Sequence, residues 1–387
     1  MTPECRVHAD AAGPDAAPRR IAVALAGASG RVGRAFAALL DARADALRAK
    51  GLALPLVGVA RSRGWRWDAD GLPPGAPQAW FAGATTGSIT GFLERARAHE
   101  GPLALVDCTA SEDVAAAAPA LLADGIAVVT ANKLGSAGTL ARWRALHAHA
   151  SALAAPYRHS ATVGAGMPVL ATVRRLRRRG ERVTTLRAVL SGSLSAVLSA
   201  VQDGAAFSDA VADARARGCT EPHPGEDLSG EDVARKLLIV LREAGLSVER
   251  SQLRVEPLVP AGLLRERDPE AFLRALPALD GAWRARAEDA ARAGRRLVFV
   301  AEYDGTRARA EVRALPESDT LATLRPGENR VELATDVHDV VPLAISGPGA
   351  GPEVTAANVL SDLLDVARGA WGARYDAEGG VSRAASA

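Results

Sequence analysis

An apolar segment that runs into a glycine-rich turn and then into a helix constrains this chain most. Residues 21–26 predict a short buried strand, which a turn with glycines at positions 27, 30 and 33 connects to a helix over about 34–50. Such a turn lets backbone N–H groups and a helix N-terminus approach a pyrophosphate. The spacing G-x-x-G-x-x-G differs from the usual dinucleotide fingerprint, so the turn needs support from its surroundings.

That support comes from the alternation that follows. Apolar segments at 54–60, 103–108 and 126–130 are separated by an irregular stretch (64–87) and by helical patterns near 88–100 and 112–123, and a further helix is expected over 136–152. Alternating strands and helices predict a parallel sheet with right-handed crossovers, which binds ligands at the carboxyl ends of its strands. The polar residues expected at that edge are Thr109, Ser111, Asn132 and Lys133.

The second strand of the predicted sheet ends in two arginines, Arg61 and Arg63, with no acidic residue beside them. In dinucleotide-binding folds an acid at this point binds the ribose 2′-hydroxyl of NAD, whereas an arginine accommodates the 2′-phosphate of NADP. We therefore expect NADP to be preferred over NAD. The alternative is that both are ordinary loop arginines.

The pattern changes after about residue 155. A strand at 183–191, a long helix near 268–293 and strands near 296–302, 308–314 and 341–345 predict an open sheet, which we expect to form a dimer. A closing helix at 354–367 is expected to pack on the nucleotide-binding part. We expect a Rossmann-type domain plus an α+β domain with an open mixed sheet. The predicted boundaries are a disordered tail (1–20), a nucleotide-binding domain (21–155, completed by 346–368), a substrate-binding and dimerisation domain (156–345) and a second tail (369–387).

Lysine is rare in this chain. Of 47 basic residues only Lys50, Lys133 and Lys236 are lysine, and the other 44 are arginine. A lysine retained against that bias suggests chemistry that arginine cannot perform, because only the amine gives up a proton near neutral pH. Lys236 follows Asp232 by four residues on a predicted helix with Ser229 as its N-cap, so the two side chains share one face. The alternative is an exposed ion pair with no function.

Composition excludes several classes of protein. The formal net charge is +2, which provides no field for nucleic acid or an anionic membrane. The three widely spaced cysteines form neither a disulfide framework nor a zinc pattern, so a reducing compartment, the cytoplasm, is expected. The first twenty residues do not resemble a signal peptide, and no apolar segment is long enough to span a membrane.

Taken together, the motifs resemble homoserine dehydrogenase over about residues 21–368. The segments that carry the resemblance are VDCTAS (106–111), VTANK (129–133), TVGAGMP (162–168), LSGSLS (190–195), CTEP (219–222), DLSGEDVARKLL (227–238) and GPGAGPEVTAA (347–357). The resemblance implies an enzyme that interconverts L-aspartate 4-semialdehyde and L-homoserine with NAD(P). It also implies a cytoplasmic homodimer without the fused aspartate kinase or the C-terminal regulatory domain that some members carry.

The resemblance also implies roles for individual residues. Lys236 would be the acid/base and Asp232 its partner; Glu221 and Asp227 would bind the substrate; and Lys133 would lie between the substrate and the nicotinamide. The backbone carbonyls of a tight loop would face a monovalent cation, namely those of Val163, Ala165 and Met167. The cofactor contacts would come from Gly27, Ser29, Gly30, Arg31, Val32, Gly33, Thr109, Lys133 and Gly351. To these the position after the second strand adds Arg61 and Arg63.

The chain departs from the family pattern in two places that matter for function. His223–Pro–Gly–Glu226 stands where the family usually has Asp-Pro-Arg-Asp, and Ser160 stands in place of a glutamate that would be the only charged cation ligand. Two other functions therefore stay open. One is an NADP-dependent reductase of another small amino aldehyde or ketone, and the other is a nucleotide-binding protein whose catalysis has decayed.

Overall fold

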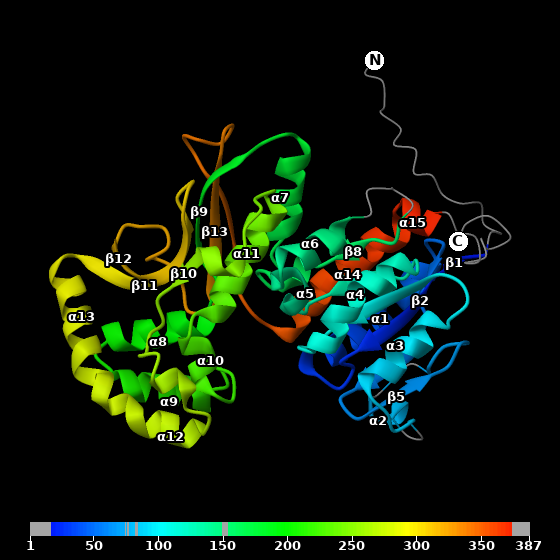
Figure 1. Ribbon diagram of the computed structural model, residues 1–387, viewed down its shortest axis with the longest axis horizontal. Helices are drawn as coiled ribbons and strands as arrows, with labels where there is room; N and C mark the ends of the chain where they lie inside the picture. Colours follow the sequence, from blue (N-terminus) through cyan, green and yellow to red (C-terminus); the bar gives the residue numbers. More distant parts are fainter. Residues whose placement is uncertain (1–16, 74, 76, 82–83, 149–153, 374–387) are drawn as a thin grey trace, which may run out of the picture. The chain divides into compact units, whose positions relative to one another are not determined.

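The computed structural model describes residues 17–73, 75, 77–81, 84–148 and 154–373 (Figure 1). The chain forms two compact units. The first comprises the chain up to residue 130, residues 147–158 and the stretch from 359 onward, and the second comprises 131–146 and 159–358. We expected the division at 155 and at 346; residues 131–146 and 346–358 instead group with the second unit.

The first unit is built on a six-stranded sheet with the strand order β5-β4-β2-β6-β7-β8. All neighbouring pairs are parallel except the edge strand β5, which pairs with β4 in the antiparallel sense. Every residue of β2 and β6 is buried, as expected for strands covered on both faces. The strands are β2 (Ala22–Ala26), β4 (Leu56–Arg61), β5 (Gly64–Trp67), β6 (Leu103–Asp107), β7 (Ala127–Thr130) and β8 (Tyr157–Arg158), with a separate pair β1 (Arg19–Arg20) and β3 (Leu52–Ala53).

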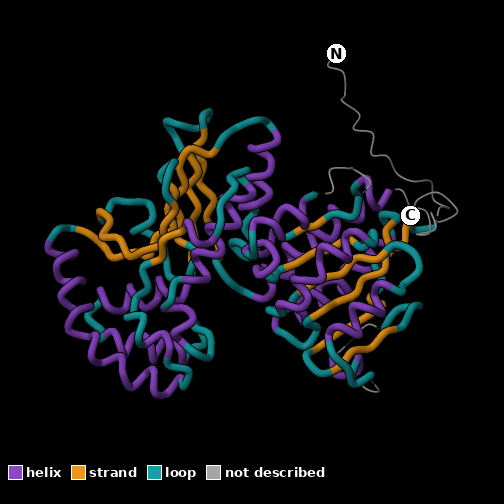
Figure 2. The backbone as a smooth tube through the Cα atoms, viewed as in Figure 1, coloured by secondary structure: helices purple, strands orange, loops and turns teal. Residues whose placement is uncertain are grey.

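Helices cover the sheet of the first unit (Figure 2). They are α1 (Arg31–Arg48), α2 (Pro77–Trp80), α3 (Ile89–Arg97), α4 (Glu112–Ala123), α15 (Ala370–Ala373) and the second half of α14 (Pro352–Arg368). The expected Rossmann-type arrangement is confirmed, and the end of α14 belongs to this unit, as predicted. The predicted tails are wrong where the structure describes them, because Arg19–Arg20 form β1 and Trp371 in α15 is buried. The remainder of both tails lies outside the described residues.

The second unit contains a six-stranded mixed sheet with the order β10-β12-β11-β9-β13-β14, which confirms the predicted open mixed sheet. Only β10 and β12 are parallel neighbours. The strands are β9 (Val183–Val189), β10 (Leu253–Val255), β11 (Arg295–Tyr303), β12 (Ala308–Pro316), β13 (Glu328–Thr335) and β14 (Leu343–Pro348). The α-helices are α5 (Lys133–Ala137), α6 (Leu140–His147), α7 (Val169–Arg178), α8 (Gly192–Gln202), α9 (Phe207–Ala216), α10 (Pro224–Leu228), α11 (Glu231–Glu243), α12 (Pro269–Ala275) and α13 (Asp280–Arg292).

One face of this sheet carries the main core. Alternate residues of the strands, such as Leu186 and Ala188 of β9 and Val331 and Leu333 of β13, pack in one apolar cluster with residues of α7, α8, α9, α11 and α13. The opposite face carries only a small apolar cluster around Val189. Other positions of that face hold arginines and acids in ion pairs, namely Arg187–Asp319, Arg187–Glu332, Arg309–Glu302, Arg313–Glu302 and Arg330–Glu332.

Two predicted helices are each divided in the structure. The stretch expected as one helix over 136–152 consists of α5 and α6, separated at Gly138, whose ψ of −159° is extended; residues 149–153 lie outside the described part. The helix expected over 268–293 consists of α12, a 3-10 turn (Leu276–Leu279) and α13, because Pro277 cannot continue the α-helical hydrogen bonds. Strands β5, β10 and β13 were not predicted at all.

A buried carboxylate near the C-terminus of α11 stabilises the second unit. Glu243 Oε2 lies 3.1 Å from Nε2 of the buried His159, and Arg174 Nε donates to Glu243 Oε1 at 2.8 Å. Burial raises the pKa of Glu243, but the hydrogen bond and charge of His159 and those of Arg174 outweigh it and lower the pKa to about 2.

Replacing Glu243 with glutamine should therefore lower the free energy of unfolding at neutral pH by about 3 kcal/mol, since it breaks a largely buried ion pair and leaves Arg174 without its counter-charge. A depressed folded pKa stabilises the fold above the unfolded value of 4.5, and that stability is lost as the pH falls towards about 2. Urea denaturation of the wild type and the variant at several pH values measures the difference in their free energies of unfolding. The wild-type advantage should shrink below pH 4.5, and an advantage that stays constant down to the folded pKa would contradict this assignment.

Candidate active site

Two lysines flank one carboxylate in the second unit. Lys236 Nζ lies 2.8 Å from Asp232 Oδ2, and Lys133 Nζ lies 3.4 Å from Asp232 Oδ1. Lys236 Nζ also donates a hydrogen bond of 2.6 Å to the backbone carbonyl of Leu190. The Lys236 side chain is 13% exposed, whereas Lys133 is 32% and Asp232 42% exposed. Lys236 is therefore largely enclosed, yet its amine remains next to the more open carboxylate.

The charges of this cluster act on Asp232. Burial raises the pKa of the carboxyl, but Lys236 and Lys133 outweigh burial through their charges and hydrogen bonds, and they hold the pKa of Asp232 well below its usual range. Asp232 is thus a carboxylate at any pH at which an enzyme would work. Each of its two oxygens contacts one ammonium group, so the carboxylate fixes the two lysines relative to each other. An isolated surface ion pair would hold only one.

The start of α11 places this pair. Gly230 is the N-cap and has a left-handed conformation, with φ of 72°. A Cβ at this position would lie 2.7 Å from the ring of Phe299, so only glycine fits. Ser229, which we predicted as the N-cap, instead ends the short helix α10, and its Oγ accepts a hydrogen bond from Glu231 N. The segment before it is helical too: Pro224 occupies the first position of α10, where proline is tolerated.

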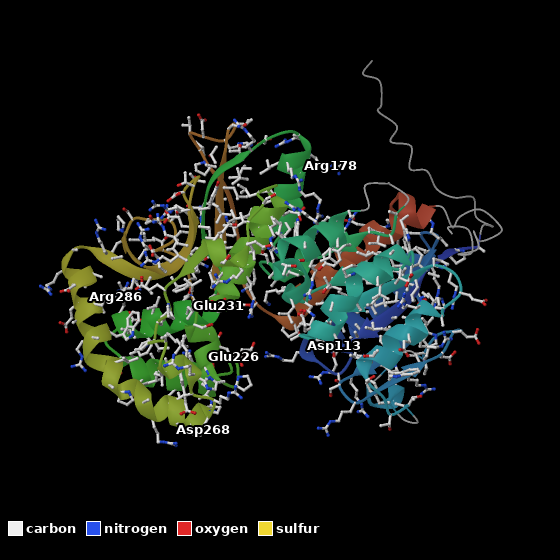
Figure 3. All side chains as sticks on the ribbon, in the orientation of Figure 1. Asp113, Arg178, Glu226, Glu231, Asp268 and Arg286 are labelled. Carbon is white, nitrogen blue, oxygen red and sulfur yellow. The ribbon has the colours of Figure 1, made fainter. Side chains whose placement is uncertain are left out.

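A second carboxylate, Asp227, lies at the end of α10. Ser193 Oγ donates to its Oδ1 at 2.7 Å, and the backbone N–H of Glu221 donates to its Oδ2 at 2.8 Å. Burial raises the pKa of Asp227 and is the largest influence on it, while these two hydrogen bonds and Lys236 act in the opposite direction. The Glu221 side chain is exposed. The acids Glu226 and Glu231 on α10 and α11 are visible in Figure 3.

Two serines at the start of α8 have different roles. Ser191 is the N-cap of the helix, since its Oγ accepts a hydrogen bond from Leu194 N. Ser193, two residues later, orients Asp227, and the Leu190 carbonyl binds Lys236. Neither contact could be found from sequence spacing, because a backbone carbonyl carries no residue signature and Ser193 is separated from Asp227 by 34 positions.

The glycine turn in the first unit has the geometry of a phosphate-binding loop. Gly27 has φ of 83°, and a Cβ there would lie 2.7 Å from the Cys108 carbonyl oxygen. A Cβ on Gly33 would lie 2.2 Å from the Gly27 carbonyl oxygen, so the helix α1 starts directly against the turn. Ser29, Gly30 and Arg31 are exposed at the N-terminus of this 18-residue helix. The N–H groups and the dipole of α1 are therefore available to an anion.

The strand ends of the first unit carry the other predicted cofactor residues. Thr109 donates to Asp107 Oδ1 both from Oγ1 (2.6 Å) and from its backbone N–H (2.9 Å). The buried Asp107 thereby fixes the turn after β6, a role that the sequence did not indicate. Arg61 at the end of β4 and Arg63 beyond it are exposed, and the Arg61 guanidinium lies 4.4 Å from the centre of the Phe81 ring. Neither arginine forms an ion pair with another described residue.

The predicted residues thus divide between the two units. Lys133, expected beside Thr109 at the edge of the first sheet, belongs to the second unit together with Asp232, Lys236, Asp227, Glu221 and Gly351.

The loop expected to face a cation also lies in the second unit. Ala165, with φ of 50°, has a carbonyl that accepts a 2.7 Å hydrogen bond from Asn358, and the Met167 carbonyl accepts one from Val169 N. Val163, Ala165 and Met167 are buried.

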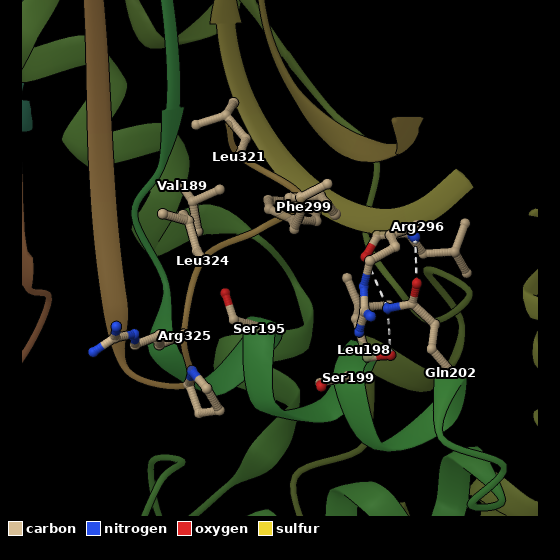
Figure 4. Close-up of a pocket in the computed structure, with 14 residues that line it drawn as sticks. Val189, Ser195, Leu198, Ser199, Gln202, Arg296, Phe299, Leu321, Leu324 and Arg325 are labelled. Carbon is tan, nitrogen blue, oxygen red and sulfur yellow. Dashed lines mark hydrogen bonds between the residues drawn. The ribbon is translucent and has the colours of Figure 1, made fainter. Parts of the chain in front are cut away.

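A small cavity lies elsewhere in the second unit. It has a volume of about 60 Å³ and is enclosed by α8, the start of β11 and the segment around Leu321–Arg325 (Figure 4). Ser195 points into it, but none of the predicted site residues lines the cavity.

No helix in the described part of the chain combines the length and hydropathy needed to cross a bilayer.

Comparison with known proteins bears on both units. Residues 168–364 match the family described as homoserine dehydrogenase, and residues 29–159 match the NAD binding domain of homoserine dehydrogenase. The chain is 34% identical over 356 residues to bifunctional aspartokinase/homoserine dehydrogenase 2 of Escherichia coli, which covers 91% of this chain and 44% of that protein. It is 38% identical over 265 residues to the chloroplastic bifunctional enzyme 2 of Zea mays, which covers 68% of this chain and 29% of that protein. The chain therefore spans less than half of the length of these curated relatives.

Solved structures resemble the whole described fold. A Candida auris protein of unknown function superimposes with a TM-score of 0.80 at 30% identity, covering 90% of this chain and 98% of that one. A hyperthermophilic archaeal homoserine dehydrogenase in complex with NADPH superimposes with a TM-score of 0.68 at 20% identity, covering 90% and 97%, which shows a common fold. Together with the matched residues of both units, these similarities show that the chain belongs to the homoserine dehydrogenase family.

Proposed function

We propose that this protein is an NADP-dependent oxidoreductase that interconverts L-aspartate 4-semialdehyde and L-homoserine, with Lys236 as the acid/base. The observation that carries the proposal is the largely enclosed Lys236 amine, held by Asp232 and the Leu190 carbonyl and accompanied by Lys133. Reduction of an aldehyde needs a hydride and a proton for the developing alkoxide. A dinucleotide supplies the hydride when bound, and the protein supplies position, charge and the proton.

The lysines suit the carbonyl end of the substrate. An ammonium group both stabilises a developing oxyanion and donates a proton to it. Lys236 has this capacity and is held at two points, so it needs little reorganisation before it donates. Asp232 retains the counter-charge after the proton has left, and Lys133 adds a second positive charge on the same carboxylate.

The acids of the same unit suit the amino end of the substrate. Aspartate semialdehyde and homoserine both carry an ammonium group, for which a carboxylate is the natural partner. Glu221 has an exposed side chain, and its backbone N–H is bonded to Asp227. We assign substrate binding to these two residues. Ser193 fixes the Asp227 carboxylate through a 2.7 Å hydrogen bond.

The first unit would hold the cofactor. The residues that fit a pyrophosphate are those of the turn Gly27–Gly33, because added Cβ atoms at Gly27 and Gly33 would collide with backbone and the α1 N-terminus is exposed. Thr109, at the end of β6, and Gly351, before α14, complete the proposed cofactor contacts. A solved relative of the same fold is described as a complex with NADPH, which is consistent with this assignment.

Arg61 and Arg63 should determine the choice of NADP over NAD. Replacing both with alanine should raise the KM for NADPH by about 100- to 10,000-fold, because two hydrogen bonds to a charged phosphate are lost and each is worth about 1.5–3 kcal/mol. The KM for NADH should change little, since NADH has no 2′-phosphate. Initial rates with each cofactor measure both effects. Equal losses with NADPH and NADH would show that the arginines do not discriminate between them.

A monovalent cation is the least supported part of the implied site. Ser160 offers no charge, and the carbonyls of Ala165 and Met167 already accept hydrogen bonds within the protein. We therefore propose that the loop Val163–Met167 holds its shape without a cation. Turnover in sodium, potassium and tetramethylammonium salts at equal ionic strength would check this point.

We also propose a homodimer that uses the face of the second sheet not covered by helices. That face combines the apolar residues around Val189 with rows of paired arginines and acids, among them Arg187 and Glu332. A sheet face of this mixed character can pack against its own copy with alternating charges opposed. Sedimentation velocity of the purified protein distinguishes a dimer from a monomer.

One assay tests the function as a whole. Purified protein is given NADPH or NADH with and without L-aspartate 4-semialdehyde, and then a panel of other small amino aldehydes and ketones. We expect oxidation that depends on aspartate semialdehyde and is faster with NADPH. A better substrate in the panel would favour the alternative reductase, for which the altered loop at His223–Glu226 is the motivating feature. Nucleotide binding without turnover of any aldehyde would indicate decayed catalysis.

A further inference from the structure

A buried arginine on α11, the helix that carries Asp232 and Lys236, has no role in the chemistry described so far. Arg242 lies near the end of α11, and its side chain is fully buried, with 0% exposure. Burial lowers its pKa and is the largest influence on it, with Glu249 acting in the opposite direction. A buried charged group is retained only where its hydrogen bonds are satisfied, so the partners of Arg242 indicate what it does.

Two of those partners are backbone carbonyls where α5 ends and the turn to α6 begins. Arg242 Nη1 donates to the carbonyls of Ser136 (2.9 Å) and Gly138 (2.7 Å), and its Nε donates to Val248 (2.9 Å). Its Nη2 lies 3.2 Å from Glu249 Oε2. The guanidinium therefore binds the carbonyl groups that the end of α5 leaves without helical partners.

Glu249 closes the arrangement from the other side. Its Oε1 accepts a 2.9 Å hydrogen bond from the backbone N–H of Leu140, the first residue of α6. One end of the turn is thus held by Arg242 and the other by Glu249, and the two side chains are paired with each other. We call these two residues the Arg242–Glu249 clamp.

The clamp matters because of the residue at the other end of α5. Lys133 is the first residue of this five-residue helix, and its amine contacts Asp232 on the first turn of α11. A helix this short does not hold its own shape, since most helical stability comes from tertiary contacts. Both ends of α5 are therefore fixed by α11, through Asp232 at Lys133 and through Arg242 at Ser136 and Gly138.

We propose that the Arg242–Glu249 clamp positions Lys133 against Asp232, and so sets the geometry of the two-lysine site from more than two helical turns away. The importance of that geometry for turnover rests on the function proposed above, but the positioning itself does not. Lysine could not replace Arg242, because one ammonium cannot bind the two carbonyls at the end of α5 and also reach Val248 and Glu249, as the three guanidinium nitrogens do.

The rarity of lysine makes the positioning directly measurable. The chain has only three lysines, so acylation of each amine can be followed separately by mass spectrometry in the intact, folded protein. Lys50 is exposed and serves as an internal reference. The acylation rate of Lys236 shows whether the second lysine of the site is disturbed as well. We expect Arg242→Gln to increase the acylation rate of Lys133 relative to Lys50 by about fivefold, the factor expected when a partly exposed ion pair is released.

A neighbouring residue on the same helix provides the matched control. Glu243 is also buried, but it binds His159 and Arg174 instead of α5, so Glu243→Gln should lower the melting temperature without changing the rate at Lys133. Glu249→Ala, at a half-exposed position, is the milder variant if Arg242→Gln does not fold, and it should raise the Lys133 rate in the same direction. In both clamp variants Lys236 and Lys50 should react as in the wild type.

The proposal is overturned if Lys133 reacts at the wild-type rate in the clamp variants, or if all three amines become faster together in those variants and in Glu243→Gln. The latter result would mean that Arg242 contributes only to general stability. Kinetics give a separate readout: the clamp variants should lose kcat more than they raise the KM for NADPH. A protein that shows the labelling change without any aldehyde reduction would retain the clamp and contradict the proposed function alone.

Discussion

Replacing Lys236 with alanine should reduce the rate of aspartate-semialdehyde reduction by about a thousandfold, within the 10²–10⁴-fold that general acid catalysis typically contributes. The same loss is expected for Lys236→Arg, because the guanidinium keeps its charge but does not give up its proton. The enclosed position of Lys236, between Asp232 and the Leu190 carbonyl, also leaves little room for the larger group. Loss of NADPH absorbance in the presence of the aldehyde measures the rate.

The chain offers a matched control for this experiment. Lys50 is exposed at the end of α1, remote from the site in sequence, and Lys50→Arg should retain wild-type kinetics. Cofactor binding by Lys236→Arg, measured by NADPH fluorescence, should also remain, because the proposed pyrophosphate-binding turn and the two arginines, Arg61 and Arg63, lie in the first unit. If Lys236→Arg kept most of the wild-type rate, proton donation by this residue would be excluded.

The second large effect is expected at Asp232. Asp232→Asn removes the carboxylate that contacts both ammonium groups, and a hydrogen bond to a charged group is worth about 1.5–3 kcal/mol, or roughly 10- to 100-fold in rate. The variant should lose kcat rather than merely raise the KM, because Lys133 and Lys236 would repel each other and leave their positions. Steady-state kinetics at saturating NADPH separate the two parameters.

A conservative replacement shows whether charge or position dominates at Asp232. Asp232→Glu keeps the negative charge but moves it by one methylene, so we expect it to recover part of the rate lost in Asp232→Asn. Because the pKa of Asp232 is held well below its usual range by the two lysines, the wild-type carboxylate stays ionised across the working pH range. An Asp232→Asn enzyme with wild-type kcat would show that the ion pair is only structural.

Much of the first unit could be predicted because its strands are nearly continuous apolar runs. β2, β6 and β7 are buried throughout, so hydrophobicity alone marks them, and the glycine turn marks the start of α1. The short edge strand β5 was missed because its two tryptophans and an arginine lie in a stretch rich in glycine and proline. Edge strands are covered on fewer sides and carry a weaker pattern.

The second unit was harder for a physical reason. β13 alternates buried residues with arginine and glutamate, and those charges are stabilised by pairing with Arg187 on β9 and with each other, which no local pattern shows. The break between α5 and α6 at Gly138 likewise depends on Arg242, which is 104 positions away in the sequence. By contrast, Pro277 was a local signal for the break between α12 and α13.

The candidate site was predictable where its contacts are local. Asp232 and Lys236 are one helical turn apart, and the structure places them 2.8 Å apart. Lys133 is about a hundred positions from Asp232, and only the family resemblance assigned it to the same site. Ser193, the Leu190 carbonyl and the Arg242–Glu249 clamp were not foreseen, because each acts through backbone groups or through residues distant in sequence.

The central claim is that a primary amine at position 236 donates the proton. Adding small primary ammonium ions, such as methylammonium, to the Lys236→Ala enzyme tests it most directly, with aspartate semialdehyde and NADPH at saturation. The account predicts a rate that rises with the concentration of the amine, that depends on the acidity of the amine, and that guanidinium fails to restore. A Lys236→Ala enzyme that turns over at the wild-type rate without added amine would contradict it.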